Sequence, residues 1–359
     1  MSGILRAGEG IAGRYLACSP DTVSWGTLPG PGAAPVLTVG SGEVVTFDTV
    51  SQEGLMEDQG RDPAAYFAGF GVPREAVLDE AVALAASDLR RERPAQAGPH
   101  VVLGPVRVLG AEPGDWLRVD FLDLRPRVPY GVISSRHGRG CLPDRLPDSP
   151  VFSRFCSLNG AYATFEHRGG RASIELRPFL GLCGVTPAEP GGPLSTIPPG
   201  PFGGNIDLRE LVAGSSLYLP VQIPGAGFFL GDPHFAQGNG EIALTALEGS
   251  LRVTLRVSVI KPPGPLDHAA GPFAETADHW VVLGLHEDLD EAMRRCAWNA
   301  VRFLSRRTGM TENEAYLYLS AAGDFSVTQV VDLVKGVHCR IRKRDVQQER
   351  APAVHPGLD

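Results

Sequence analysis

The chain lacks the short motifs of several large enzyme classes. It has no G-x-S-x-G motif of a serine nucleophile. Its glycine-rich stretches have neither the lysine of a phosphate loop nor the strand–GxGxxG–helix context of a dinucleotide site. None of its six cysteines forms a CxxC pair, which argues against a thiolate zinc site or a redox motif. Any chemistry must therefore come from other side chains.

The chain is also poor in basic charge and in long apolar runs. Its 33 Lys and Arg are outnumbered by 41 Asp and Glu, for a formal net charge of −8, which argues against a nucleic-acid partner. No apolar run approaches the length of a membrane span, and the first residues show no signal-peptide pattern. With its cysteines widely spaced and expected to be reduced, we expect a cytoplasmic protein with no membrane partner.

The composition predicts a mainly β protein. Glycine (44 residues) and proline (31 residues) are abundant in a chain of 359, which implies many turns and short strands. Strand patterns cover Val36–Val50, as two arms around a Ser41-Gly42 turn, and further runs at Val101–Val108, Trp116–Leu124, Ser173–Leu176, Ser216–Ile223, Gly227–Leu230, Ile242–Leu247 and Leu251–Val259. Helical spacing covers Val77–Arg91, and Leu208–Ala213 fits one or two helical turns.

The pattern changes after about Leu285. Asp288–Arg307 has an apolar stripe at helical spacing, and Thr311–Glu314 matches a capping box that opens a second helix to about Ala322. Strand patterns follow at Val327–Leu333 and Val337–Ile341. We therefore expect an α+β chain: a β body over residues 1–285, a smaller C-terminal α/β section over 286–346 packed on it, and a disordered tail over 347–359.

Side chains that bind hard metal ions concentrate between Pro198 and Glu248. Asp232 and His234 lie two residues apart, so on a strand they share one face and can bind zinc together. The segment Gly203–Asp207 adds Asn205 and Asp207 directly after two glycines. Each piece also has an ordinary explanation, because Asp207 suits a helix N-cap and the Asp232 segment suits a surface turn.

The next residues complete this candidate site. Asn239-Gly240 is a strong hairpin signal, so a return strand starting at Glu241 would bring that carboxylate back beside Asp232 and His234. A carboxylate close to a metal-activated water can act as general base. The alternative is a plain hairpin with Glu241 at a wet strand end. Other histidines, including His100, are weaker candidates.

Several blocks of the chain resemble the acetamidase/formamidase family of metal-dependent amidases. They are GGNID, LVAGSSLYLPV, GAGFFLGDPHFAQGNGE, TVSWG, PVLTVGSGEVVTFDTV, GPHVVLGPVRVLGAEPGDWLRV, RPFLGLCGVTP and EDLDEAMRRCAWNAVRFL. The resemblance implies a jelly-roll-like β-sandwich with an added α/β section. It also implies hydrolysis of short amides with a divalent metal, zinc in the first place and calcium as the alternative.

The resulting hypothesis is a C–N hydrolase for a small linear amide such as acetamide or formamide, acting as a homo-oligomer. It assigns Asp207, Asp232 and His234 to the metal, Glu241, His234 and Asp232 to catalysis, and Asn205 and Gln237 to the substrate.

Two other functions stay open. Ser24 and Asn239 stand where the family often has His and Asp, which motivates a non-catalytic descendant that binds a small ligand or only assembles. The second is hydrolysis of a cyclic amide or a ureido bond. For it, the stretch Arg125–Pro150, expected to be a long loop, offers cationic contacts to an acidic substrate through Arg136, His137 and Arg139, unless that loop is simply solvated.

Overall fold

The computed structural model describes residues 3–90, 94, 96–188, 192–262 and 271–346. Among these residues one sheet of nine strands has the order β1 (Arg14–Leu16), β4 (Glu43–Asp48), β16 (Leu251–Ile260), β6 (Trp116–Pro126), β13 (Ser216–Pro220), β17 (Phe273–Glu275), β18 (His279–His286), β20 (Lys335–Arg342) and β19 (Asp324–Gln329). The expected tail at 347–359 lies outside the described residues.

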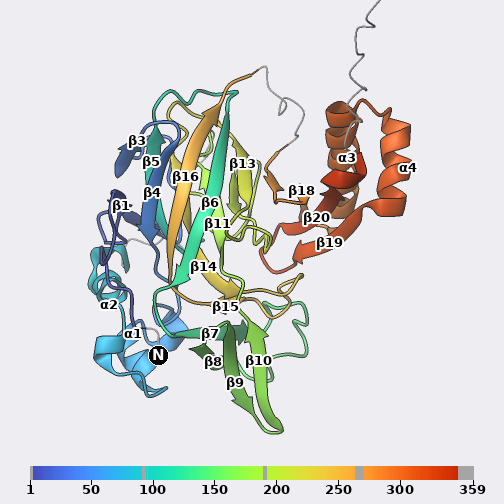
Figure 1. Cartoon of the computed structure of the whole chain (residues 1–359). Coiled ribbons are helices and arrows are strands. Elements are labelled where there is room, and N and C mark those ends of the chain that lie inside the picture. The colour runs from blue at the N-terminus through green and yellow to red at the C-terminus, as the bar shows by residue number, and fades with distance from the viewer. Residues whose placement is uncertain (1–2, 91–93, 95, 189–191, 263–270, 347–359) are drawn as a thin grey trace, which may run out of the picture.

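The second sheet carries the candidate site. Its main path is β10 (Gly170–Glu175), β9 (Tyr162–His167), β8 (Val151–Asn159), β7 (Tyr130–Arg136), β15 (Leu247–Glu248), β14 (Phe228–Ala236), β11 (Phe179–Val185) and β12 (Gly203–Asn205). A side branch starts at β14, which pairs with β5 (Val101–Val108), and β5 in turn pairs with β2 (Val23–Trp25) and β3 (Leu37–Val39). The long central strands of the two sheets run side by side in Figure 1.

The main core lies between these two sheets. Phe47 of β4 and Phe228 of β14 are both fully buried, and their rings meet edge to face with centroids 6.4 Å apart. Apolar residues at alternate positions of the central strands, such as Val253, Leu255 and Val257 of β16, fill this layer, as expected for a sandwich whose inner faces are dry. The expected mainly β fold class is confirmed.

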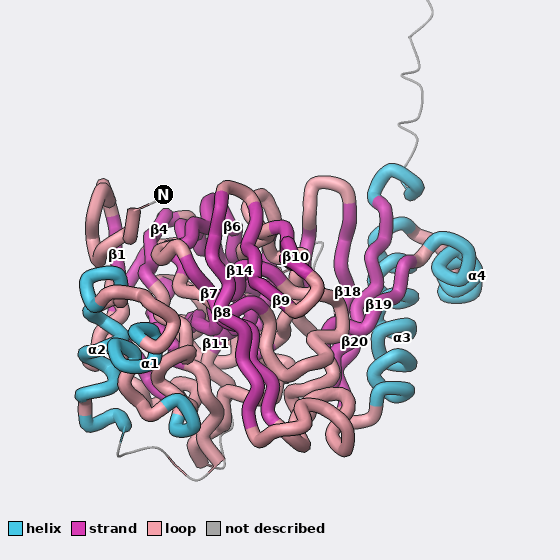
Figure 2. The backbone as a smooth tube through the Cα atoms, turned by 90° about the horizontal axis from the view of Figure 1, so that it is seen from below, coloured by secondary structure: helices cyan, strands magenta, loops and turns pink. Residues whose placement is uncertain are grey.

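A second, smaller core lies under the C-terminal helices α3 (Leu289–Thr308) and α4 (Glu312–Ala322), which cover β18 and β20 (Figure 2). A Cβ on Gly284 of β18 would lie 2.2 Å from the backbone nitrogen of Cys296, so the missing side chain lets α3 approach the sheet closely. Asp288 caps α3, and the expected capping box of Thr311 and Glu314 opens α4. Two short helices, α1 (Pro63–Ala68) and α2 (Asp79–Ala86), lie near the other edge.

Several expected elements are wrong. Arg125–Pro150 is not one loop, because β6 extends to Pro126 and Tyr130–Arg136 forms β7 between two partner strands. The arms of Val36–Val50 do not pair with each other, since β3 and β4 lie in different sheets. Leu208–Ala213 forms turns rather than a helix. Proline and glycine obscure the period in Arg125–Pro150, and strand pairing depends on distant partners.

The expected return strand Ile242–Leu247 is also wrong. Only Leu247 belongs to a strand, and Ile242 is 63% exposed. The loop is drawn to β19 instead, because the Gly240 nitrogen donates to the Thr328 carbonyl at 3.0 Å and Gly240 forms an isolated bridge with Gln329. Glu241 therefore lies in a turn.

None of the described helices is long and apolar enough to cross a membrane.

Candidate metal centre and active site

Four neighbouring strands, in the order β15, β14, β11 and β12, bring the residues of the site together. Asp232 and His234 lie on β14, two positions apart, and His234 is in register with Glu248 of β15. Asn205 ends β12, and Asp207 follows two residues later. Because β11 pairs with both β12 and β14, the Asp207 and Asp232 segments lie on either side of β11.

Gly181 of β11 lies beneath three of these side chains. A Cβ added there would lie 2.4 Å from Asp207 Oδ1, 2.6 Å from Asp232 Oδ2 and 2.7 Å from His234 Cε1. Real Cβ atoms do not approach other atoms so closely, so only glycine leaves room for this group of donors. The three side chains that the sequence predicts as metal ligands thus surround one point.

The imidazole of His234 has two different sides. The Gln237 side chain donates from Nε2 to the Asp207 carbonyl at 2.9 Å, which leaves its Oε1 to accept from His234 Nδ1 at 3.2 Å. A ring nitrogen that donates in this way fixes the tautomer and leaves the other nitrogen to bind a metal. Gln237, predicted to bind substrate, instead makes these two internal hydrogen bonds.

His234 Nε2 points at two carboxylates. It lies 3.0 Å from Asp232 Oδ2 and 3.2 Å from Glu248 Oε1. Burial alone would lower the pKa of His234, but the charges of Asp232 and Glu248 raise it well above its usual range. The same negative potential that holds a proton on Nε2 would hold a divalent cation in its place.

These donors fit a metal ion. Zinc bonds of about 2.0–2.2 Å in tetrahedral geometry separate the ligand atoms by about 3.3–3.6 Å, within a few tenths of an ångström of the observed distances. Asp232 Oδ1 and Asp207 Oδ1 are also buried without a hydrogen-bond partner among the described residues. Within that part of the chain, two sets of three residues hold their ligand atoms within 4.8 Å of one another: Asp232, His234 and Glu248, and Asp207, His234 and Glu241.

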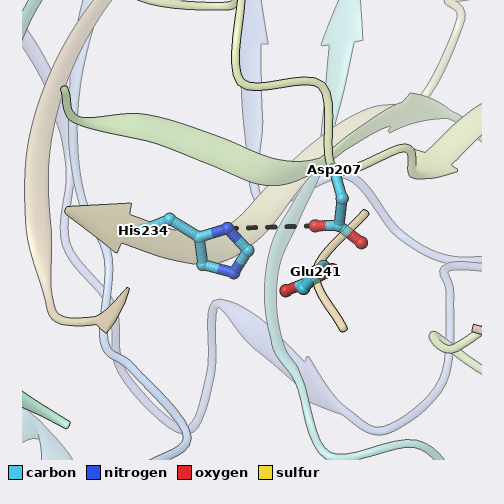
Figure 3. Close-up of side chains that lie close together, drawn as sticks. All are labelled: Asp207, His234 and Glu241. Carbon is cyan, nitrogen blue, oxygen red and sulfur yellow. Dashed lines mark ion pairs between the residues drawn. The ribbon is translucent and has the colours of Figure 1, made fainter. Parts of the chain in front are cut away.

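The second set includes an acidic group close to His234. Figure 3 shows Asp207 opposite Nδ1, with its Oδ1 3.9 Å from that nitrogen, and Glu241 beside both side chains. Burial raises the pKa of Asp207 to about 7. The charge of His234 opposes this shift, and the charge of Asp232 adds to it. Burial and the charge of Asp207 raise the pKa of Glu241, and of the adjacent Asp332, well above the usual range. This group can therefore hold protons near neutral pH.

The two sets lie at the inner end of a cavity of about 760 Å³. Non-glycine residues with positive φ are rare because their side chains strain the backbone. Of the seven such residues in the described part of the chain, all except Ala226 border this cavity: Arg61, Asp207, Asp232, Glu241, Leu244 and Leu333. Backbone strain concentrated around one cavity is typical of a functional site.

Several cavity residues were missed by sequence reasoning. Glu248 is the most important, and Gln52 supports it by donating from Nε2 to Glu248 Oε2 at 3.0 Å. Asp332 comes from the turn after β19. His100, a weak candidate in the sequence, places Nε2 3.8 Å from Asp232 Oδ2. Burial alone would raise the pKa of Asp232, but His234 and His100 hold it well below its usual range.

Some sequence candidates lie elsewhere. Neither Ser24 nor Asn239 is among the described residues that line the cavity, and Ser24 Oγ instead donates to the Thr27 carbonyl at 2.6 Å. Arg136 and Arg139, which belong to the expected loop Arg125–Pro150, do line the cavity. Arg136 is paired with Asp58 at 2.9 Å.

Glu53, which also lines the cavity, makes the stability of the fold depend on pH. Burial, opposed by Arg136, raises the pKa of its carboxyl from 4.5 to about 7. The folded chain therefore holds a proton that the unfolded chain loses between these values, so the free energy of unfolding falls as pH rises through this window, by up to about 3 kcal/mol. In urea unfolding of metal-free protein, wild type should lose more stability than Glu53→Gln between pH 5 and pH 8. A difference between the two proteins that does not change with pH would contradict this assignment.

The fold and this centre define a class of protein: a mainly β sandwich in which a buried carboxylate–imidazole centre, suited to a divalent cation, lines a cavity. The profile of the Acetamidase/Formamidase family matches residues 80–190 and 192–341, well over half of the chain. The chain therefore belongs to this family.

Individual relatives agree with this membership. An acetamidase of Mycolicibacterium smegmatis is 27% identical over 62% of this chain and 73% of its own, and a formamidase of Methylophilus methylotrophus is 25% identical over 65% and 74%. The solved acetamidase of Yersinia enterocolitica superposes with a TM-score of 0.75 at 25% identity over 96% of both chains. That of Bacillus halodurans gives 0.72 at 26% identity over 92% of this chain and 98% of its own. The chain is thus a hydrolase of carbon–nitrogen bonds in small linear amides.

Proposed function

We propose that the chain cleaves a small primary amide, of the acetamide or formamide type, to a carboxylate and ammonia at the centre around His234. Asp232, His234 and Glu248 would hold a divalent metal, with Glu248 in place of the Asp207 that the sequence suggests. Such an ion polarises an amide carbonyl and lowers the pKa of a water molecule. Zinc is preferred to calcium because the set includes an imidazole nitrogen, whereas calcium takes oxygen ligands.

Glu241 is the proposed general base. Its Oε2 is buried without a hydrogen-bond partner among the described residues, and its side chain borders the cavity beside Asp207. A carboxyl group whose pKa is raised can take a proton from the attacking water and then pass it to the departing nitrogen near neutral pH. The nearby carboxyl groups of Asp207 and Asp332 would disfavour a negative charge on Glu241 during this exchange.

Asn205 is the proposed positioning group for the substrate. It lies 2% exposed at the cavity wall, and its side chain makes no hydrogen bond within the described residues. A side-chain amide at that place can donate to the amide oxygen or accept from the amide nitrogen. Gln237 would act through His234 rather than on the substrate. It would hold His234 in the tautomer that leaves Nε2 free.

The observation that carries this proposal is the convergence of Asp232 and Glu248 on His234 Nε2 at the inner end of the cavity. We expect chelation to abolish ammonia release from acetamide, and zinc to restore it better than calcium in parallel reconstitutions. Elemental analysis should find less metal in Glu248→Gln than in wild type, because one ligand charge is lost. Glu166→Gln, a surface variant on β9, is the matched control and should keep its metal.

Two results would contradict the proposal. Full ammonia release by protein that elemental analysis shows to be free of metal would remove the metal from the mechanism. No release from any short amide by metal-loaded protein would favour a descendant that binds but does not cleave.

A further inference from the structure

A second cavity, of about 410 Å³, opens beside the segments that carry Asp207 and Glu241. Among the described residues around it, three are arginines, Arg177, Arg209 and Arg340, and one is a carboxylate, Glu210. In a chain with a net charge of −8, three arginines around one small cavity are unexpected.

These guanidinium groups have few counter-charges. Within the described part of the chain, Arg177 and Arg209 form no ion pair and donate no side-chain hydrogen bond. Arg340 pairs with the half-exposed Asp324, yet its Nε is buried with no acceptor among the described residues. The carboxylate that lines the cavity, Glu210, instead lies 3.6 Å from His338 Nε2. The cavity therefore has more positive charge than its own walls neutralise.

This excess of positive charge affects the pKa of a buried imidazole nearby, that of His338. Burial lowers the pKa of His338, Glu210 opposes that shift, and both Arg340 and Arg209 add to it. The two guanidiniums thus act on the same buried side chain, and both line the cavity. Like charges held together repel, and an anion between them would offset that cost.

The geometry points to a ligand, and we propose that this cavity binds a small oxyanion, phosphate or a carboxylate, at a site separate from the metal centre. Guanidinium groups match the paired oxygens of both anions through parallel N–H donors. A concave cavity favours a small anion over an acidic protein surface, which would need a broad and flatter patch.

The site borders the loop that carries Glu241. Asn239 lines the cavity, and the next residue, Gly240, bridges to Gln329 of β19. Glu210, which also lines the cavity, follows Asp207 by three residues. A bound oxyanion would therefore brace both segments that bring carboxylates to the metal centre.

Isothermal titration of the metal-loaded protein with phosphate, and separately with acetate, tests the proposal at constant ionic strength set with chloride. Arg209→Gln should weaken binding at least about tenfold, since it removes one charge-assisted pair. Arg168→Gln, in the turn between β9 and β10, removes an equal charge from the surface and should bind like wild type. The stronger of the two anions identifies the class of ligand.

A second variant, Arg177→Gln, tests the same proposal independently, in case Arg209→Gln fails to fold. Both variants should keep the far-ultraviolet circular dichroism of wild type. Anion binding that is unchanged in both variants would place it at the metal centre and overturn the proposal. The absence of any anion-specific heat with wild type would overturn it as well.

Discussion

Replacing Gly181 with alanine is expected to reduce amide hydrolysis at least about a hundredfold and to lower the metal content of the purified protein. The added Cβ would lie 2.4 Å from Asp207 Oδ1, 2.6 Å from Asp232 Oδ2 and 2.7 Å from His234 Cε1. These side chains are fully buried, so they cannot move into solvent to relieve the overlap. A displacement of about 1 Å at a catalytic centre is enough for a loss of this size.

The backbone around Gly181 cannot absorb the extra atom either. β11 pairs with β12 on one side and with β14 on the other, and the Asp207 nitrogen donates to the Gly181 carbonyl at 3.1 Å. Moving β11 away would break that bond and shift Asp207 itself. The donors must therefore give way, and His234 Nε2 would lose its alignment with Asp232.

A matched glycine separates this effect from a general cost of alanine. Gly238 lies in the loop after Gln237, has no atom within 4 Å of an added Cβ, and does not need positive φ. Gly238→Ala should keep both metal and ammonia release, measured by elemental analysis and a colorimetric assay. Near-normal rates and metal in a folded Gly181→Ala protein would show that the donors around Gly181 do not form the working centre.

The local part of this site can be predicted from the sequence, and the long-range part cannot. Asp232 and His234 stand two apart in a strand, and that period alone places them on one face. Glu248 stands opposite His234 only through the pairing of β14 with β15, across a connection with no regular spacing. Its neighbours in the sequence, Leu247 and Gly249, contain nothing that marks it as a ligand.

The position of Glu241 and the arrangement of the strands show the same difference between local features, which the sequence predicts, and long-range features, which it does not. The Asn239-Gly240 pair predicts a hairpin, but the backbone of Gly240 finds a better partner in Thr328, almost ninety residues away. Alternating apolar residues predict several strands, among them β5, β6, β13 and β16, but not β8, β9 or β11. The assignment of β3 and β4 to different sheets depends on partners that no local pattern names.

Replacing Glu241 with glutamine is expected to lower kcat by about 10²–10⁴-fold while the metal stays bound. The side chain keeps its shape in this variant but can no longer take a proton from water. Glu241 has a backbone φ of +45°, a strained conformation that glutamine would inherit unchanged, so the backbone gives no separate cause for a loss. Steady-state kinetics with acetamide, together with elemental analysis, measure both quantities.

Two comparisons make this result specific to a base. Glu57→Gln removes an equal charge at the outer wall of the same cavity, where the carboxylate is 83% exposed, and should leave kcat nearly unchanged. Glu248→Gln should lower activity together with metal content, whereas Glu241→Gln should separate them. If Glu241→Gln keeps wild-type kcat, another group takes the proton, and Asp207, whose pKa is about 7, is the next candidate. If it loses its metal with its activity, Glu241 is a ligand, and the set of Asp207, His234 and Glu241 holds the ion instead.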